Sequence, residues 1–431
     1  MQEVDFDAIV VGAGCAGSIA AYELAHAGKS VLLVERGNFA GSKNMTGGRL
    51  YAHSLRTVLP DFESEAPLER RITHERISLM SGESNFAIDF TSGDMRNEAY
   101  ASYSVLRGPF DQWLAGKAEQ AGAEAIYGIP VEELTRDETG RVSGIRAGED
   151  EISANVVILC DGANSLLGAG AIGSASLASQ YAVGVKQVFQ LDEQTINDRL
   201  LCAPGEGAAW LFVGDVSDGV FGGGFMYTNR DSISLGVVAG IEACATSGGK
   251  PVYQMLEDLK RHPAVAPLIR DAKVVEHSGH MIPEGGLTAM PSLVGDGVML
   301  AGDNAMMCIN LGYMVRGMDY AIAAGSMAGK QAVCAIDAGD TSKKGLSGYI
   351  DALEDSFVMK DLHQFADEPA FLESFDRMFG AYPKAACDFM DALFLVDGSP
   401  VRPMKTKIKP IVKQLGFMNV MKDMRGAMKT L

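Results

Sequence analysis

The stretch that decides the fold is "AIVVGAGCAGSIAAYELAHAGKSVLLVE", residues 8–35. Its first four residues are apolar, as in a buried strand, and residues 15–27 have the composition and spacing of a helix. Residues 30–35 form a second apolar run that ends at an acidic side chain. A strand, a helix and a strand in this order predict a βαβ unit with parallel strands.

Three glycines separate the first strand from the helix in the pattern Gly-x-Gly-x-x-Gly. Gly12 permits a tight turn, Gly14 lets the backbone approach a pyrophosphate, and Gly17 lets the helix pack close to the strand. The phosphates would then face the helix N-terminus. Glu35 ends the second strand, where an acid accepts hydrogen bonds from a ribose diol. These positions predict a dinucleotide site. Cys15 is expected to be there as a small residue in the glycine loop and not to have a redox role.

The residues after Glu35 favour FAD over NAD. An NAD domain usually continues with regular βα units, whereas residues 36–51, "RGNFAGSKNMTGGRLY", are polar and glycine-rich. FAD enzymes of the glutathione-reductase type pass such a loop under the flavin.

Two later apolar runs end in short acidic motifs. Residues 156–160 precede Asp161-Gly162, and residues 298–301 precede Gly302-Asp303. In this FAD class a strand that ends in Gly-Asp places its carboxylate on the ribityl hydroxyls, so Asp303 is the candidate for that contact. The helix that follows would direct its positive end at the flavin.

With these motifs in place, the chain resembles the electron transfer flavoprotein–ubiquinone oxidoreductases, and most of all their short FixC-type bacterial branch. The resemblance covers roughly residues 5–400 and rests on "VVGAGCAGSIAAYELA", "GSKNMTGGRLY", "YSVLRGPFDQWLAGKAEQAGAE", "VILCDGANS", "HMIPEGG", "GVMLAGDNAMMCIN" and "VRGMDYAIAAG". The related geranylgeranyl reductases and aromatic hydroxylases share the region of Arg107 to Asp111 and both acidic motifs.

The motifs and the resemblance together imply one non-covalently bound FAD and no metal ion. The expected FAD-binding residues are Gly12, Gly14, Cys15, Ala16, Gly17, Glu35, Arg36, Lys43, Asn44, Met45, Thr46, Gly47, Gly48, Arg107, Val131, Asp161, Gly162, Gly302, Asp303, Leu311, Gly312 and Met314. Arg316 and Gly317 are expected to tune the flavin, which carries the chemistry itself. His277 and His280 have a metal-ligand spacing, but the nearby Gly and Pro predict a loop and no third ligand is evident.

The fold class implied is α/β, with a discontinuous Rossmann-type FAD-binding domain of the glutathione-reductase kind. Its expected segments are 1–75, 100–170 and 290–340. The resemblance implies an inserted antiparallel β-rich domain for substrate or quinone, residues 76–99 and 171–289. Residues 180–240 agree with this, because they alternate apolar and polar in short runs. Residues 341–431 form a C-terminal helical region with a basic tail.

The charge and the cysteines exclude several classes of function. The net charge of −18 argues against a nucleic-acid partner. The seven cysteines are scattered without a CxxC pair, so an iron–sulfur cluster is not expected in this chain. Neither a signal peptide nor a run of about 18 apolar residues is present. We therefore expect a cytoplasmic protein, at the inner face of the cell membrane if its tail contacts lipid.

The basic tail is the exception to the acidic composition. Residues 401–431 hold eight Lys or Arg against one Asp, a net charge of +7, which leaves −25 for residues 1–400. Pro403 and Pro410 are expected to break its first third, and apolar residues follow near helical spacing. Docking of an acidic ferredoxin-like partner, contact with anionic lipid headgroups, and a solvated helix packed on its own domain all stay open.

The resemblance implies an electron-transfer oxidoreductase. Electron transfer flavoprotein, with its alpha and beta subunits, would donate electrons, FAD would hold them, and a quinone or a small ferredoxin-like iron–sulfur protein would accept them. The alternatives are a geranylgeranyl-reductase-like saturase, an NAD(P)H-dependent aromatic hydroxylase and a non-enzymatic flavin-bearing scaffold subunit.

Overall fold

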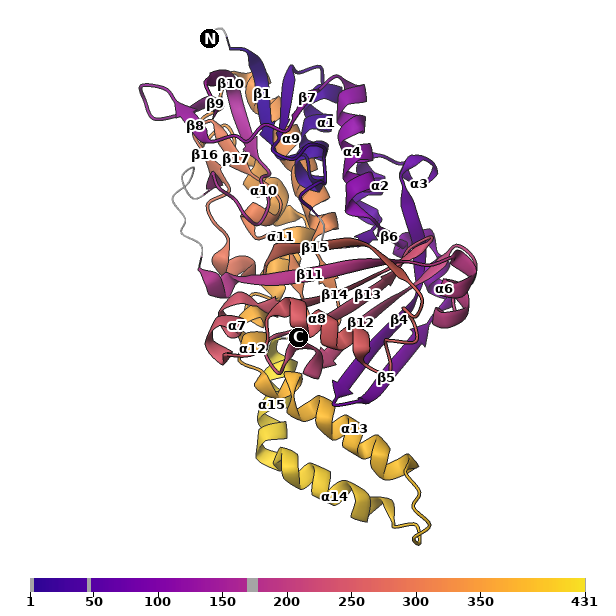
Figure 1. The fold of residues 1–431 in the computed structure, drawn as a ribbon. Helices are drawn as coiled ribbons and strands as arrows, with labels where there is room; N and C mark the ends of the chain where they lie inside the picture. Colours follow the sequence, from indigo (N-terminus) through magenta and orange to yellow (C-terminus); the bar gives the residue numbers. More distant parts are fainter. Residues whose placement is uncertain (1–3, 45–47, 169–176, 431) are drawn as a thin grey trace.

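The computed structural model describes residues 4–44, 48–168 and 177–430, which form two β-sheets, the helices that cover them and a group of C-terminal helices (Figure 1). Met45, Thr46 and Gly47, three of the expected FAD-binding residues, lie outside the described residues.

The first sheet has at its centre the parallel strands that the opening stretch predicts, and β16, β9 and β8 add antiparallel pairs at its margins. β1 (Phe6–Val11) lies between β10 (Asp150–Leu159) and β2 (Val31–Glu35) and runs parallel to both. The strand order is β16-β17-β10-β1-β2-β7, and β9 and β8 continue from β10. The other strands are β7 (Glu124–Tyr127), β8 (Glu133–Arg136), β9 (Val142–Ala147), β16 (Val294–Gly295) and β17 (Val298–Leu300).

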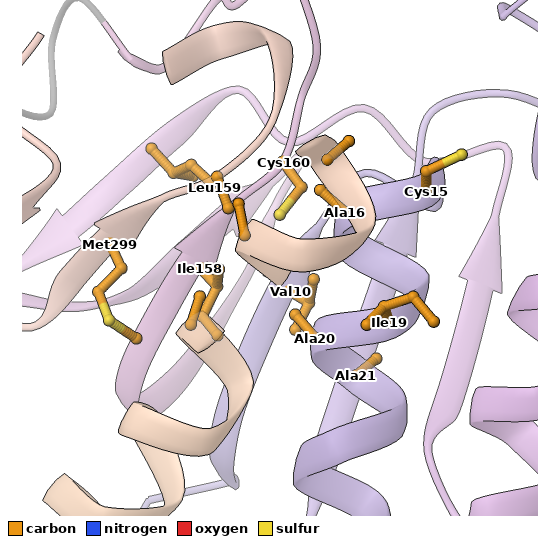
Figure 2. Close-up of a cluster of buried hydrophobic side chains, with 14 of the residues drawn as sticks. Val10, Cys15, Ala16, Ile19, Ala20, Ala21, Ile158, Leu159, Cys160 and Met299 are labelled. Carbon is orange, nitrogen blue, oxygen red and sulfur yellow. The ribbon is translucent and has the colours of Figure 1, made fainter. Parts of the chain in front are cut away.

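Three helices pack together beside this sheet: α1 (Cys15–His26), α4 (Arg107–Ala121) and α9 (Met318–Ala338). α1 and α9 approach closely, because a Cβ atom built on Gly325 would lie 2.2 Å from the carbonyl oxygen of Ala16. Val10, Ala20 and Ile158 belong to the buried core between helix and sheet (Figure 2). Small residues on the two helices therefore fix the position of α9 against α1.

The second sheet has nine strands in the order β15-β11-β14-β13-β12-β4-β6-β3, with β5 paired to β4. Its neighbours are antiparallel except for β12 and β4, which are parallel. The strands are β3 (Arg49–Tyr51), β4 (Leu68–Ser81), β5 (Ser84–Thr91), β6 (Ser102–Val105), β11 (Tyr181–Gln190), β12 (Glu206–Gly214), β13 (Gly222–Thr228), β14 (Ser232–Gly240) and β15 (Lys273–Pro283).

The pairing in this sheet places two segments differently from the expected domain boundaries. β3 and β6 pair with each other, and β6 pairs with β4, although residues 1–75 and 100–170 are expected in the FAD-binding domain. A short apolar run does not reveal which of two sheets it joins. We therefore propose that β3, β4 and β6 belong with the β-rich domain.

β15 corrects a second expectation. The segment with His277 and His280 is a strand paired to β11 and not a loop. Residues three apart in a strand project to opposite faces, and the His277 ring accordingly bonds the Gln187 amide at 3.0 Å while His280 lines a cavity. Among the described residues, no group of three or more His, Cys, Asp or Glu could hold a metal ion.

The remaining helices connect or cover the sheets or form the C-terminal group. They are α2 (His53–Val58), α3 (Phe62–Glu65), α6 (Glu193–Leu200), α7 (Ile241–Ser247), α8 (Val252–Arg261), α10 (Gly348–Asp355), α11 (Phe357–Gln364), α12 (Glu368–Glu373), α13 (Ala381–Phe394), α14 (Met404–Leu415) and α15 (Phe417–Thr430).

α13 and α14 pack side by side and project away from the two sheets (Figure 1). Pro410 lies inside α14, so the expected break there is wrong. α15 returns to the body of the molecule, where Asp423 accepts hydrogen bonds from Arg377 and Tyr382. None of the helices in the described part of the chain is both long and apolar enough to cross a membrane.

Candidate functional site

A cavity lies between the two sheets, where β1, β2, β10 and β17 end. One wall comes from the loops that follow these strands, and the other from β3, β13 and β15 of the second sheet. The expected residues that line it are Gly12, Gly14, Cys15, Ala16, Glu35, Arg36, Lys43, Asn44, Gly48, Arg107, Val131, Asp161, Gly162, Gly302, Asp303, Arg316 and Gly317. Gly17, Leu311, Gly312 and Met314 do not line it.

The three glycines of the first loop have different surroundings. Gly12 has φ +100°, and a Cβ atom on it would lie 2.3 Å from the Cys160 carbonyl oxygen. A Cβ atom on Gly17 would lie 1.8 Å from the Gly12 carbonyl oxygen. The nearest atom to a Cβ on Gly14 is the Asn44 amide nitrogen at 3.0 Å. Gly12 and Gly17 thus permit strand and helix to touch, while Gly14 faces the cavity.

Glu35 is held at the end of β2 by two backbone donors. The Ala13 N–H donates to its Oε2 at 2.9 Å and the Gly37 N–H to its Oε1 at 2.7 Å. Each carboxylate oxygen can accept more than one hydrogen bond. Glu35 therefore keeps acceptor capacity toward the cavity it lines, as a ribose-binding acid requires.

A buried ion pair supports the loop below the glycines. Arg107, the first residue of α4, donates from Nε and Nη2 to Asp111 at 3.0 and 2.9 Å, and Asp111 is fully buried. Asn44 also donates to Asp111, at 3.1 Å. Burial raises the pKa of the Cys15 thiol to about 12, so this side chain is neutral at neutral pH. The ion pair joins α4 to the polar loop and presents Arg107 to the cavity.

The two acidic motifs occupy neighbouring positions with different environments. Asp161 accepts hydrogen bonds from Ser165 Oγ and the Leu166 N–H, both at 3.1 Å, and from the Asn304 amide at 2.9 Å. Asp303 begins the short helix η6 (Asp303–Ala305) directly after β17 and lines the cavity. Asp161 thus fixes the turn, whereas Asp303 faces the cavity.

The N-terminus of α9 points at the same cavity. Gly317 precedes its first turn, and both Gly317 and Met318 line the cavity. Arg316 is paired away from it: its guanidinium donates to Asp319 at 2.5 Å and to Asp361 at 2.9 Å. Its positive charge is therefore largely offset by two carboxylates.

The cavity also contains residues outside the expected FAD-binding set, although the sequence raises His280 and rejects it as a metal ligand. They are Arg49, Tyr227, His280, Glu284, Cys308 and Asn310. They come from the second sheet or from the hairpin of β18 (Ile309–Asn310) and β19 (Val315–Arg316). Burial lowers the pKa of His280 to about 4 and raises that of Glu284 to about 7. The polar residues of "HMIPEGG" were the available signal, but the loop expectation hid their orientation.

These features fit a dinucleotide. Gly14, whose Cα faces the Asn44 amide and Arg107, and the N-terminus of α1 suit a pyrophosphate, and Glu35 suits a ribose. Asp303 and the N-terminus of α9 line the same cavity.

Comparisons with known proteins agree with this geometry. Residues 7–100 match the domain described as FAD dependent oxidoreductase, and residues 368–431 match the ETF-QO/FixC family C-terminal domain. The chain is 49% identical over 99% of both chains to the probable electron transfer flavoprotein-quinone oxidoreductase YdiS of Escherichia coli. It is 36% identical, over 98% of both chains, to the protein FixC of Bradyrhizobium diazoefficiens.

Solved structures show the same fold at lower identity. A geranylgeranyl bacteriochlorophyll reductase-like protein from Thermoplasma acidophilum covers 98% of this chain and 99% of its own, with a TM-score of 0.71 and 19% identity. The flavin-dependent brominase Bmp2 covers 95% and 98%, with a TM-score of 0.62 and 16% identity.

The fold and the site thus define an FAD-dependent oxidoreductase. Within that class, the chain belongs to the electron transfer flavoprotein–quinone oxidoreductase/FixC family.

Proposed function

We propose that this chain takes electrons from electron transfer flavoprotein and passes them to a quinone, to a separate ferredoxin-like protein, or to both. The observation that carries the proposal is the match over 99% of both chains to a relative named as an electron transfer flavoprotein-quinone oxidoreductase. When bound, FAD supplies the redox chemistry, accepting electrons from one partner and releasing them to the next.

The residues of this chain hold and orient the cofactor. Gly14 and the α1 N-terminus would bind the pyrophosphate, Glu35 the adenosine ribose and Asp303 the ribityl hydroxyls. The α9 N-terminus would place its backbone N–H groups beside the flavin, where their partial positive charge favours an anionic ring. The buried Arg107–Asp111 pair would keep the supporting loop in place.

A direct experiment separates the donor from the acceptor. Purified FAD-loaded protein is mixed with reduced electron transfer flavoprotein, and the bleaching of its flavin absorbance is followed by stopped flow. Re-oxidation is then started with a short-chain quinone or with the ferredoxin-like protein. If the flavin does not bleach, electron transfer flavoprotein is not the electron donor. If neither acceptor re-oxidises the flavin, the proposed acceptors are excluded.

An iron assay tests where an iron–sulfur cluster resides. The seven cysteines are free in the structure and distributed over four helices and three loops. We expect iron and acid-labile sulfide to be absent from the isolated chain, so that any cluster would belong to the separate partner. A stoichiometric 4Fe–4S signal after reduction would contradict this.

The saturase and hydroxylase alternatives predict different chemistry. Both require NAD(P)H or another reductant to be consumed with an organic substrate, geranylgeranyl groups for the saturase and a phenol for the hydroxylase. The 19% identity to the geranylgeranyl reductase-like structure supports a shared fold and not a shared substrate. Product formation with either substrate, in the absence of transfer from electron transfer flavoprotein, would favour an alternative.

A further inference from the structure

A half-buried carboxyl group and a buried one lie near each other where the cavity borders the C-terminal helices. Glu284 follows β15 and lines the cavity. Glu368 is the first residue of α12, is 2% exposed, and its Oε1 has no hydrogen-bond partner in the described structure. The two segments are in contact, because a Cβ atom on Gly286 would lie 3.2 Å from the Pro369 ring.

The neighbours of Glu284 offer weak polar contacts and no cation. The Asn310 amide donates to its Oε2 at 3.2 Å, and the Glu284 backbone N–H donates to the Gln180 carbonyl at 2.8 Å. The Cys308 thiol donates to the Pro283 carbonyl at 2.7 Å. Within the described residues, neither Glu284 nor Glu368 forms an ion pair.

Other titratable groups near the pair do not neutralise it. His280, on the strand that precedes Glu284, is uncharged at neutral pH, because burial lowers its pKa to about 4. Burial and the nearby carboxyl groups of Glu284, Asp303 and Glu368 raise the pKa of Cys308 well above its ordinary value. The surroundings therefore oppose a negative charge on either glutamate.

The same conditions keep protons on the glutamates. Burial raises the pKa of Glu284 to about 7, and the Asn310 hydrogen bond opposes this only in part. Burial, followed by the charge of Glu284, raises the pKa of Glu368 to about 8. Interacting groups of this kind titrate as a pair. At neutral pH the pair thus holds at least one exchangeable proton at the cavity wall.

We propose that Glu284 and Glu368 form a proton store, from which Glu284 donates a proton to the molecule that is reduced in the cavity. This rests on the proposed function, because a quinone takes up two electrons and two protons to become a quinol. In the step proposed, the O–H bond of Glu284 breaks and an O–H bond forms on one quinone oxygen. The electrons come from reduced FAD. Glu284 is then reprotonated from Glu368 or solvent and donates the second proton to the other quinone oxygen, and the pair regains both protons from solvent.

The protonation of the pair can be measured without turnover. Infrared spectra of the oxidised, FAD-loaded protein are recorded in H2O and D2O across a pH titration, and the carboxylic C=O band is followed. We expect the wild-type band to persist at pH 7. Glu284→Gln should lower the apparent pKa of Glu368, because the charge that opposes ionisation of Glu368 is gone. Glu368→Gln should leave the apparent pKa of Glu284 near 7.

Turnover gives the second readout. Reduction of a short-chain quinone needs protons, whereas ferricyanide accepts single electrons without them, so the ratio of the two rates isolates proton donation. Glu284→Gln should lower this ratio at least about 100-fold, the size typical of general acid catalysis, and Glu284→Asp should restore part of it. Glu373→Gln, an exposed carboxyl on the same helix, is the matched control and should change neither rate.

The outcomes distinguish a failure of the proton store from a failure of the proposed function. A wild-type protein without a protonated carboxyl at pH 7, or a Glu284→Gln variant with the wild-type rate ratio, would overturn the proton store. If wild-type protein reduces no quinone, the acceptor in the proposed function fails, and the infrared titration still decides whether the pair holds its proton.

Discussion

The FAD cradle, which is the first sheet with its glycine loop at residues 12–17, and the C-terminal helices differ in the solvent exposure of their apolar side chains. The central strands of the first sheet are fully buried: Val10, Leu33 and Ile158 are each 0% exposed. The C-terminal hairpin, residues 394–430, exposes large apolar side chains, such as Phe394 at 75% and Met428 at 83%.

The difference indicates what each region is suited to contact: the cradle suits the cofactor and its own backbone, and the hairpin suits another surface. The cradle is defined by contacts so close that only glycine fits at Gly12 and Gly17. The hairpin combines exposed apolar groups with lysines, which are the features of a surface that meets another surface. A substitution in the cradle should therefore act on the cofactor or the fold, and one in the hairpin on association.

The largest effect is expected in the cradle, from Gly14→Val. The valine side chain would enter the space that faces the cavity, beside Asn44 and Arg107. We expect FAD retained per folded chain to fall at least about 10-fold, equivalent to about 1.4 kcal/mol of binding free energy. Flavin absorbance after gel filtration measures this.

Gly116→Ala is the matched control for that variant. Gly116 lies in α4, and a Cβ atom there meets nothing within 4 Å, so FAD should be retained and the helix stabilised by about 1 kcal/mol. A folded Gly14→Val protein with full flavin absorbance would show that the pyrophosphate lies elsewhere.

The next effect is expected in the hairpin, from neutralising Lys405, Lys409 and Lys413. All three are exposed, whereas Lys407 donates to the Ala392 carbonyl and so has a structural contact. If the tail docks an acidic partner, the triple change to Gln should slow electron transfer several-fold at low salt and little at high salt, because attraction is screened beyond about 8 Å at physiological ionic strength.

The control for the hairpin is the separate variant Lys407→Gln, which removes one positive charge from a partly buried contact and should act on helix stability rather than on salt dependence. If the triple variant transfers electrons at the wild-type rate at every ionic strength, the tail does not dock an acidic partner through these lysines. Sedimentation with anionic vesicles then tests lipid contact with the same proteins.

A smaller effect is expected where the hairpin joins the body. Asp423 is the buried acceptor for Arg377 at 2.5 Å and Tyr382 at 2.7 Å, and these hydrogen bonds hold its pKa below the usual range. Asp423→Asn should cost about 1 kcal/mol, because Arg377 is partly exposed and the pair is screened. Hydrogen exchange in residues 417–430 should rise, while exchange in β1 stays unchanged.

The sign of its pH dependence follows from that lowered pKa. The stabilisation by Asp423 is fully present above its unfolded-state pKa of about 3.9 and is lost as the pH falls through its lower folded-state pKa. The Asn variant should lack this acid-induced loss. An α15 that stays protected in the variant at every pH would contradict the role of Asp423 as an anchor.

The smallest effect is expected from Arg316→Ala. The positive charge of Arg316 favours reduced flavin, so its removal should lower the flavin potential, but Asp319 and Asp361 already offset much of that charge. A redox titration measures the shift. An unchanged potential would leave the α9 N-terminus as the source of positive field, and Lys330→Ala, on the same helix but distant from its N-terminus, serves as the control.

The sequence by itself determined the features that depend only on residues close together along the chain. The glycine spacing, the apolar runs on either side and the acids that end the strands act through local backbone geometry. The βαβ unit, Glu35 at the end of β2 and the position of Asp303 after β17 could therefore be predicted, and the structure has each of these elements. The alternation of residues 180–240 indicated the strands of the second sheet, and the family resemblance added that these strands form an inserted domain.

Only the tertiary structure decided the second wall of the cavity and the state of its acids. The pairing of β15 with β11, which turns His280 toward the cavity, depends on residues about 90 positions apart. Glu284 and Glu368 are 84 positions apart in the sequence, and their protonation follows from desolvation. Because desolvation arises from everything packed around a group, it has no signature in the residues adjacent to it.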